Sequence, residues 1–202
     1  MRRFTYILFA LMLVFLSACA NKEDNNKSKE SEQTKEQSVD VEKGLFNVEI
    51  TLPASMFEGQ DINKVIADVE KEGIKVTKNE DGSLTYKMSK AKHKEMMKEM
   101  KGNIIDVVNE TKQNKEDYKS IKDITYNDSF TEFTMVVDKA TYENSMDGFA
   151  AFGLGMAGMM YQLYNGVKSE DTKVTIKLKD QATQKQFDQI VYPDDLNNEK
   201  SE

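Results

Sequence analysis

Apolar and polar residues alternate along several short segments, and this period of two constrains the fold more than any other feature of the sequence. Phe46, Val48, Ile50 and Leu52 alternate with polar residues in the first segment. Similar patterns follow over 84–88, 133–137 and 174–178. Since neighbouring side chains of a strand point to opposite faces, each segment predicts a strand with one buried face. Strands of this kind form mostly antiparallel sheets.

Helical spacing of apolar residues predicts three helices. The first covers 62–69, and Gly73 provides its C-terminal stop. The second has its apolar face over 93–108 and begins near Ser89, a residue that favours the N-cap. The third is a glycine- and methionine-rich segment over 142–164.

Turn residues predict two hairpins. Asp81-Gly82 lies between the segments 74–78 and 84–88, and Asn127-Asp128 lies within 121–137. Residues 180–192 are compatible with a short helix, but their apolar end favours a final strand over 187–192.

The elements follow the order β-α-β-β-α-β-β-α-β, with one further strand at the end. This order predicts a single α+β domain over 44–196, with two layers: a mostly antiparallel sheet and about three helices on one face. The opposite face is expected to be polar and is the natural candidate for a binding surface. Its predicted members are Glu49, Thr85, Lys87, Thr134 and Lys177.

The N-terminus has the organisation of an export signal. Arg2 and Arg3 precede a continuous apolar run of ten residues, Ile7 to Leu16. A membrane-spanning helix needs about 20 apolar residues, so this run is too short to be one. The next residues, Leu16-Ser17-Ala18-Cys19, resemble the lipobox of bacterial lipoproteins.

This resemblance implies a signal peptide over 1–18 and a lipid thioether on Cys19. Fatty acyl chains of the palmitate class would then hold the mature protein on the extracytoplasmic side of the cell membrane, and two chains give a stable anchor. Residues 19–43 are the lipidated cysteine and a polar segment, which we expect to be a disordered tether. The polar tail at 197–202 is also expected to be disordered.

Charge and cysteine content exclude several classes of function. Cys19 is the only cysteine, so the folded part has no disulfide, thiolate metal site or cysteine nucleophile. Loss of Arg2 and Arg3 with the leader takes the formal net charge from -7 to -9. An acidic chain is poorly suited to nucleic acid, which requires a basic patch.

A glycine pattern in the third helix resembles a cofactor motif. Gly153-Leu154-Gly155-Met156-Ala157-Gly158 matches G-x-G-x-x-G. A dinucleotide site requires this pattern at a turn between a strand and a helix. Here it lies within a longer apolar segment, so we predict close helix packing and no cofactor. Membrane or partner contact by the same segment is the alternative.

One face of the second helix carries a possible soft-metal site. His93, Met96, Met97 and Met100 follow helical spacing, and imidazole and thioether ligands suit Cu(I). The same residues are also needed to bury that helix, so packing is the first interpretation and a metal site a weak candidate.

The chain is predicted not to be an enzyme. It has one histidine and neither a G-x-S-x-G nor an H-E-x-x-H motif. A paired-carboxylate glycosidase is the enzyme class that the sequence leaves open. The sequence as a whole is similar to the small uncharacterised lipoproteins of Gram-positive bacteria.

The predicted function is therefore a non-catalytic binding or structural role at the cell envelope. The predicted partners are the bilayer, through acylated Cys19, and an unidentified envelope protein. The alternatives are a solute- or peptide-binding lipoprotein of a transporter and a copper-handling protein.

Overall fold

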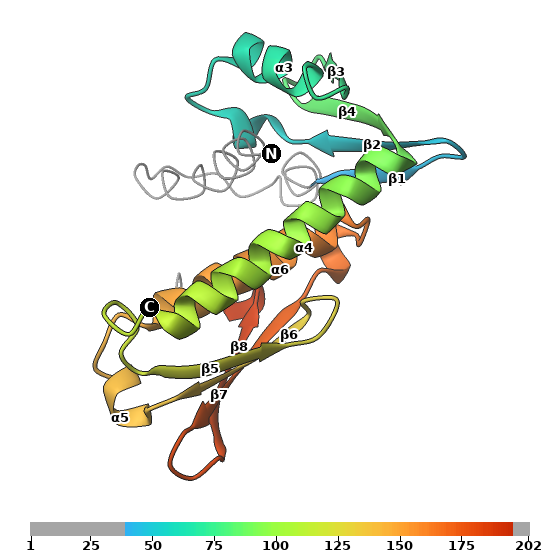
Figure 1. Ribbon diagram of the computed structural model, residues 1–202. Coiled ribbons are helices and arrows are strands. Elements are labelled where there is room, and N and C mark those ends of the chain that lie inside the picture. Colours follow the sequence, from blue (N-terminus) through green and yellow to red (C-terminus); the bar gives the residue numbers. More distant parts are fainter. Residues whose placement is uncertain (1–38, 196–202) are drawn as a thin grey trace, which may run out of the picture. The chain divides into compact units, whose positions relative to one another are not determined.

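The computed structural model describes residues 39–195, so Cys19, the leader at 1–18 and the tail at 197–202 lie outside the described residues. The described residues form two compact units (Figure 1), with the boundary between Ser89 and Lys90. Each unit contains a four-stranded sheet. The predicted α+β class is confirmed, but the chain has two sheets where one was expected. An alternating pattern identifies a strand and does not say which strand it pairs with.

The first unit has the sheet order β1-β2-β4-β3, and every neighbouring pair is antiparallel. Its elements are β1 (Asp40–Lys43), β2 (Asn47–Leu52), the 3-10 helix η2 (Ala54–Phe57), α3 (Ile62–Glu70), β3 (Lys75–Lys78) and β4 (Leu84–Ser89). The crossover from β2 through α3 to β3 leaves β4 between those two strands.

A helix cap and a tight turn shape the first unit locally. The carboxylate of Asp61 accepts hydrogen bonds from the backbone amides of Asn63 and Lys64 and so caps α3. In the β3–β4 turn, Asp81 accepts from the amide and the hydroxyl of Ser83, and Gly82 has a φ of +84°. The hairpin predicted at Asp81-Gly82 is therefore confirmed.

Strand β1 occupies four residues that the sequence assigned to the tether. It pairs with β2, with Val41 opposite Ile50. Val39 is buried just before it. These two valines were the large apolar residues of the predicted tether, and pairing with β2 gives the segment a backbone partner that composition alone does not reveal.

The second unit has the sheet order β5-β6-β7-β8, in which β6 and β7 are parallel and the outer pairs are antiparallel. Its elements are α4 (Lys90–Gln113), β5 (Ile121–Tyr126), β6 (Glu132–Val137), α5 (Lys139–Tyr142), α6 (Gly148–Tyr164), η3 (Ser169–Asp171), β7 (Val174–Asp180) and β8 (Gln186–Tyr192). The final strand, favoured over a helix at 187–192, is confirmed.

Helices α4 and α6 lie on one side of this sheet (Figure 1). The buried residues of β6 and β7 face them: Phe133, Met135, Val137, Val174, Ile176 and Leu178. A Cβ on Gly158 of α6 would lie 3.0 Å from Val174 Cγ2 and 3.3 Å from Phe133 Cε2, so α6 lies directly on this face. The other side of the sheet carries the polar residues of the same strands.

The third predicted helix, 142–164, begins later than expected. Residues up to Tyr142 form the separate short helix α5, and α6 starts at Gly148. Residues 143–147 separate the two helices. Asp147, the N-cap residue of α6, has a buried carboxylate that accepts from the amide and the hydroxyl of Ser120. The division into two units does not test the prediction of one domain over 44–196, which stays a prediction.

Candidate functional site

The predicted soft-metal residues lie in the interior of the second unit. His93, Met96, Met97 and Met100 are 7–8% exposed. Nε2 of His93 lies 2.9 Å from the backbone oxygen of Tyr164 and must donate to it, because a carbonyl only accepts. The stripe therefore joins the start of α4 to the end of α6, and its thioethers are not presented to solvent.

The glycine motif serves close packing within α6. The ring of Tyr192 stands where a Cβ of Gly155 would be, and a Cβ on Gly158 would lie 2.5 Å from the backbone oxygen of Phe130. Gly153 faces open space. No strand leads directly into the motif, because Gly148 to Tyr164 is one continuous helix. The arrangement differs from the turn that a dinucleotide requires.

The exposure of α6 bears on the alternative that this segment contacts a membrane or a partner. Most of its side chains are buried, including Ala151, Leu154 and Met159. Phe152, Met156, Met160, Tyr161 and Leu163 are half-buried, and Phe149 is exposed, at 65%. In the part of the chain that the structure describes, no helix combines the length and the apolar character needed to cross a membrane.

The polar sheet face predicted from the sequence exists, but it is divided between the two sheets. Glu49 and Lys87 form an ion pair on the first sheet, beside a hydrogen bond of 3.0 Å between the hydroxyls of Thr51 and Thr85. Thr134 and Lys177 lie on the second sheet and are half-buried.

We define the open face as the side of the second sheet opposite α4 and α6. Its residues are Thr125, Glu132, Thr134, Val136, Thr175, Lys177, Lys179, Gln186, Gln189 and Val191. One row crosses all four strands, because Thr125 pairs with Thr134, Thr134 with Lys177, and Lys177 with Gln189. Three of these four side chains end in uncharged hydrogen-bonding groups, with one ammonium between them.

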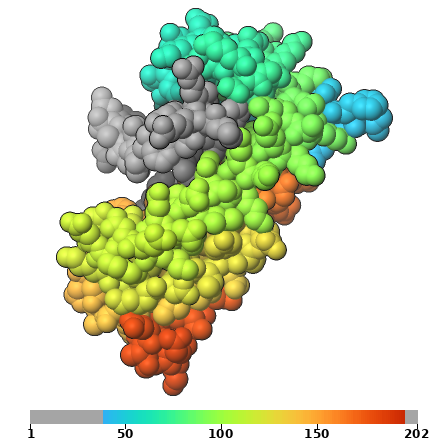
Figure 2. Space-filling model, in the orientation of Figure 1, coloured from blue at the N-terminus to red at the C-terminus, as the bar shows by residue number. Residues whose placement is uncertain are grey.

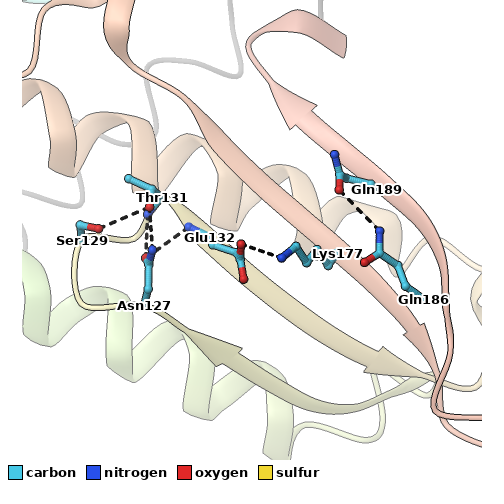
Figure 3. A network of polar contacts seen from close by, with 7 residues as sticks. All are labelled: Asn127, Ser129, Thr131, Glu132, Lys177, Gln186 and Gln189. Carbon is cyan, nitrogen blue, oxygen red and sulfur yellow. Dashed lines mark hydrogen bonds and ion pairs between the residues drawn. The ribbon is translucent and has the colours of Figure 1, made fainter.

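Hydrogen bonds and an ion pair organise this face (Figure 3). Lys177 Nζ lies 2.7 Å from Glu132 Oε2, across the parallel pair β6–β7. Gln186 donates to Gln189 at 3.5 Å along β8. Both members of the ion pair keep about a third or more of their side-chain surface in solvent, at 33% and 45%. Solvated donors and acceptors are thus held at fixed positions.

The β5–β6 turn at one end of the open face is held in place from several directions. The Asn127 side chain donates to Thr131 Oγ1 at 2.6 Å and accepts from the amides of Thr131 and Glu132 (Figure 3). Asp128 accepts a hydrogen bond of 2.9 Å from Lys101 of α4, and this bond lowers the pKa of Asp128. The turn predicted at Asn127-Asp128 is confirmed.

Phe130 holds the same turn through its buried side chain. Its side chain is fully buried, and it stacks on Phe133 at 5.9 Å and meets the Tyr161 ring edge-on at 5.0 Å. Its φ of 54° is uncommon for a residue with a Cβ. Burial of the ring therefore holds the backbone in a conformation that would otherwise be disfavoured. Sequence reasoning missed this residue, because it considered only the polar residues of the turn.

The open face offers groups for recognition by hydrogen bonds and charge. The one histidine of the chain, His93, lies in α4, and the one cysteine is Cys19. His93 does not belong to the open face, and Cys19 lies outside the described residues. Across residues 39–195, no three histidine, cysteine, aspartate or glutamate side chains gather closely enough to hold a metal ion.

The first unit has a small hollow beside the β1–β2 turn. It has a volume of about 210 Å³ and is lined by Glu42, Gly44, Leu45, Phe46, Asn47, Glu49 and Lys87. Pockets for small ligands usually measure about 300–1,000 Å³ and are mostly apolar. This hollow is smaller and carries three charged side chains, so it gives no support to a transporter-type solute binder.

Comparison with known proteins identifies a family. Residues 41–149 match the family model of the Adhesin P1 N-terminal domain. The match runs from β1 to the beginning of α6 and takes in more than half of the 202 residues. No curated protein and no solved structure matches the chain.

Proposed function

Because the chain belongs to the family of the Adhesin P1 N-terminal domain, we propose that it is a non-catalytic binding protein of the cell surface, held on the membrane by a lipid on Cys19. The family match is the observation that carries the binding role, since an adhesin-like domain fits attachment to another surface. The specific partner, an envelope protein or a molecule outside the cell, is a matter for experiment.

The lipid anchor is supported by the N-terminal sequence. A basic start, an apolar run of ten residues and Leu16-Ser17-Ala18-Cys19 follow one another in the order of a lipoprotein signal. Two acyl chains on one cysteine suffice for stable attachment, where a single chain binds reversibly. An acidic mature chain would gain little from anionic headgroups, so the lipid is the expected source of attachment.

The open face is the binding surface that we assign to this role. Four strands present a continuous row of hydroxyl, ammonium and amide groups, and both helices lie on the opposite side. The Lys177–Glu132 ion pair and the Asn127 side chain fix the groups around this row before any partner arrives. Preorganised groups lose less conformational entropy on binding.

The anchor is tested by Cys19→Ser in the native host. The unaltered protein should be found in the membrane fraction and should be accessible to protease added to intact cells. The variant should appear in the medium or the soluble fraction. A variant that stays in the membrane fraction would contradict the lipid anchor and leave the binding role intact.

The binding surface is tested with beads coated with the mature chain. Retention is measured on a panel of immobilised surface glycoproteins and on envelope material from the host. Lys177→Gln removes one positive charge from the open face, and Lys98→Gln removes one from the exposed side of α4 as the matched control. We expect Lys177→Gln alone to reduce retention. Equal retention of both variants and the unaltered protein would contradict the assignment of the open face.

A further inference from the structure

Two large apolar side chains are exposed at the turn between β1 and β2. Leu45 is 81% exposed and Phe46 is 77% exposed, more than Met146, Phe149 or Val107. We call this pair the hairpin tip. In Figure 2 the β1–β2 hairpin, coloured blue, projects from the rest of the first unit.

Turn chemistry does not require these residues. Tight turns favour Gly, Asn, Asp, Ser and Pro, and the neighbours Gly44 and Asn47 already supply two of them. The ladder ends with Lys43 opposite Val48, so the hairpin tip lies beyond the last paired residues of β1 and β2. Adjacent leucine and phenylalanine at this place therefore need another explanation than folding.

We propose that the hairpin tip inserts into the interfacial layer of the lipid bilayer. The inference rests on the proposed anchorage through Cys19, which would keep the protein beside that bilayer. The tip would add a second point of contact and so limit the orientations that the first unit adopts at the membrane.

The length of chain before β1 makes this contact possible. Twenty residue steps separate Cys19 from Val39, so even a fully extended chain places β1 within about 70 Å of the anchor. Strand β1 then leads directly to the tip. Tethering converts insertion into an intramolecular step at high effective concentration, where even a weak contact is populated.

The size and surroundings of the tip favour lipid over a protein partner. A specific protein interface buries about 800 Å² on each side, far more than two side chains supply. Behind the tip, Glu42, Glu49 and Lys87 line the adjacent hollow, and Glu49 is paired with Lys87. A contact with apolar side chains at its end and charged groups behind them matches the change from acyl chains to headgroups.

The chain contains no tryptophan, so one introduced tryptophan reports on its own surroundings. Phe46→Trp is prepared in the lipidated full-length mature protein and reconstituted in phosphatidylcholine vesicles that contain brominated acyl chains. Met146→Trp is the matched control, since Met146 is similarly exposed but lies in the second unit. We expect a blue-shifted emission and strong bromine quenching for Phe46→Trp, and neither for Met146→Trp.

Different outcomes separate this inference from the proposed function. If the protein fractionates with the vesicles but Phe46→Trp is unquenched, tip insertion is wrong and the anchor stands. If native Cys19 carries no lipid, the proposed anchor is wrong. A blue shift that grows with protein concentration in the absence of vesicles would mean that the tip contacts a second copy, which would also overturn the inference. Leu45→Ser in the Phe46→Trp background should weaken the quenching, because it removes the apolar neighbour.

Discussion

The two units each place helix against a four-stranded sheet, but they differ in how much helix they use and in how their buried polar groups are satisfied. In the first unit, α3 has nine residues, and Val69 is its one buried side chain. In the second unit, α4 and α6 have 24 and 17 residues and bury side chains along their whole length.

The two units also differ in how their parallel strands are connected. The crossover β2–α3–β3 leaves a gap that β4 fills, whereas β6 and β7 are adjacent and parallel after the longer crossover through α6. Parallel pairing of adjacent strands requires a connection that covers the sheet. The long apolar α6 supplies this cover, which explains why it has no charged residue between Gly148 and Tyr164.

Buried polar groups in the second unit have partners. The side chain of Gln162 donates to the backbone oxygens of Gly158 and Lys173 and accepts from the Lys173 amide. In the first unit, the buried Tyr86 hydroxyl has no hydrogen-bond partner. Buried polar groups with complete partners favour one arrangement of the core. We call the second unit the platform, because longer helices cover its sheet and its buried polar side chains have partners.

The largest expected effect is that of adding a methyl group to α6 where it packs closely on the sheet. Gly158→Ala places a Cβ 2.5 Å from the backbone oxygen of Phe130, which cannot move without displacing the β5–β6 turn. We expect a loss of about 2–3 kcal/mol in the free energy of unfolding. Gly153→Ala is the control, because its Cβ meets nothing within 4 Å, and it should stabilise α6 by about 0.5–1 kcal/mol. Denaturant unfolding of both variants measures the difference, and similar values would contradict the close approach of α6.

The next largest loss of stability is expected at a buried aspartate, Asp147, and it is compared with the loss at an exposed one, Asp61. Asp147 is 4% exposed and accepts from the amide of Ser120 at 2.8 Å and from its hydroxyl at 2.5 Å. Asp147→Ala leaves both donors without their partner, and we expect a loss of about 2 kcal/mol. Asp61 is an exposed cap of α3, and Asp61→Ala should cost about 1 kcal/mol. Hydrogen exchange should show the effect of Asp147→Ala in the second unit and the effect of Asp61→Ala in the first unit. An equal loss in both would argue against the difference between the units.

A smaller effect of opposite sign is expected at Tyr86. Burial raises the pKa of Tyr86 to about 12, and the buried hydroxyl has no hydrogen-bond partner. Tyr86→Phe removes this hydroxyl and should stabilise the first unit by up to about 1 kcal/mol. Thr111 of α4 is also buried, but its hydroxyl donates to the Val107 oxygen at 2.8 Å, so Thr111→Val should destabilise by about 0.5–1 kcal/mol. Thermal unfolding gives both signs, and a destabilised Tyr86→Phe would mean that the hydroxyl has a partner after all.

How much of the fold can be predicted from the sequence depends on whether a feature is local or joins distant residues. Alternation at Phe133, Met135 and Val137 predicted β6 and its buried face, because that pattern is local. Pairing is not local, since the register between β6 and β7 depends on residues more than 40 positions apart. The division into two sheets and the strand β1 were therefore missed.

The polar sheet face was only partly predictable. Thr134 and Lys177 could be assigned to it, because they alternate with buried neighbours. The residues that support the face could not be found in this way. Asn127 and Phe130 act through the conformation of a turn, and a φ of 54° at a phenylalanine has no signal in the sequence.

The smallest expected effect concerns an ion pair that joins two elements of the platform. Lys112 of α4 lies 2.6 Å from Asp123 of β5, and their hydrogen bond lowers the pKa of Asp123 below its ordinary value of 3.8. A carboxylate whose pKa is lowered by folding stabilises the folded state above the unfolded pKa, and this contribution is lost as the pH falls through the folded pKa. Both side chains are partly solvated, so Lys112→Gln should cost less than about 1 kcal/mol at pH 7.

The cost of Lys112→Gln should disappear as the pH falls below 3.8, which makes the acid side of its stability curve flatter than that of the unaltered protein. Lys71 and Asp68 in the first unit form the comparison pair, at 2.8 Å; Asp68 lies in α3 and Lys71 is the C-cap residue of the same helix. Because that pair joins no two elements, Lys71→Gln should change the curve less. If Lys112→Gln and Lys71→Gln flatten the curve equally, ion pairing between elements is not what distinguishes the platform, and the difference between the units lies in their buried groups alone.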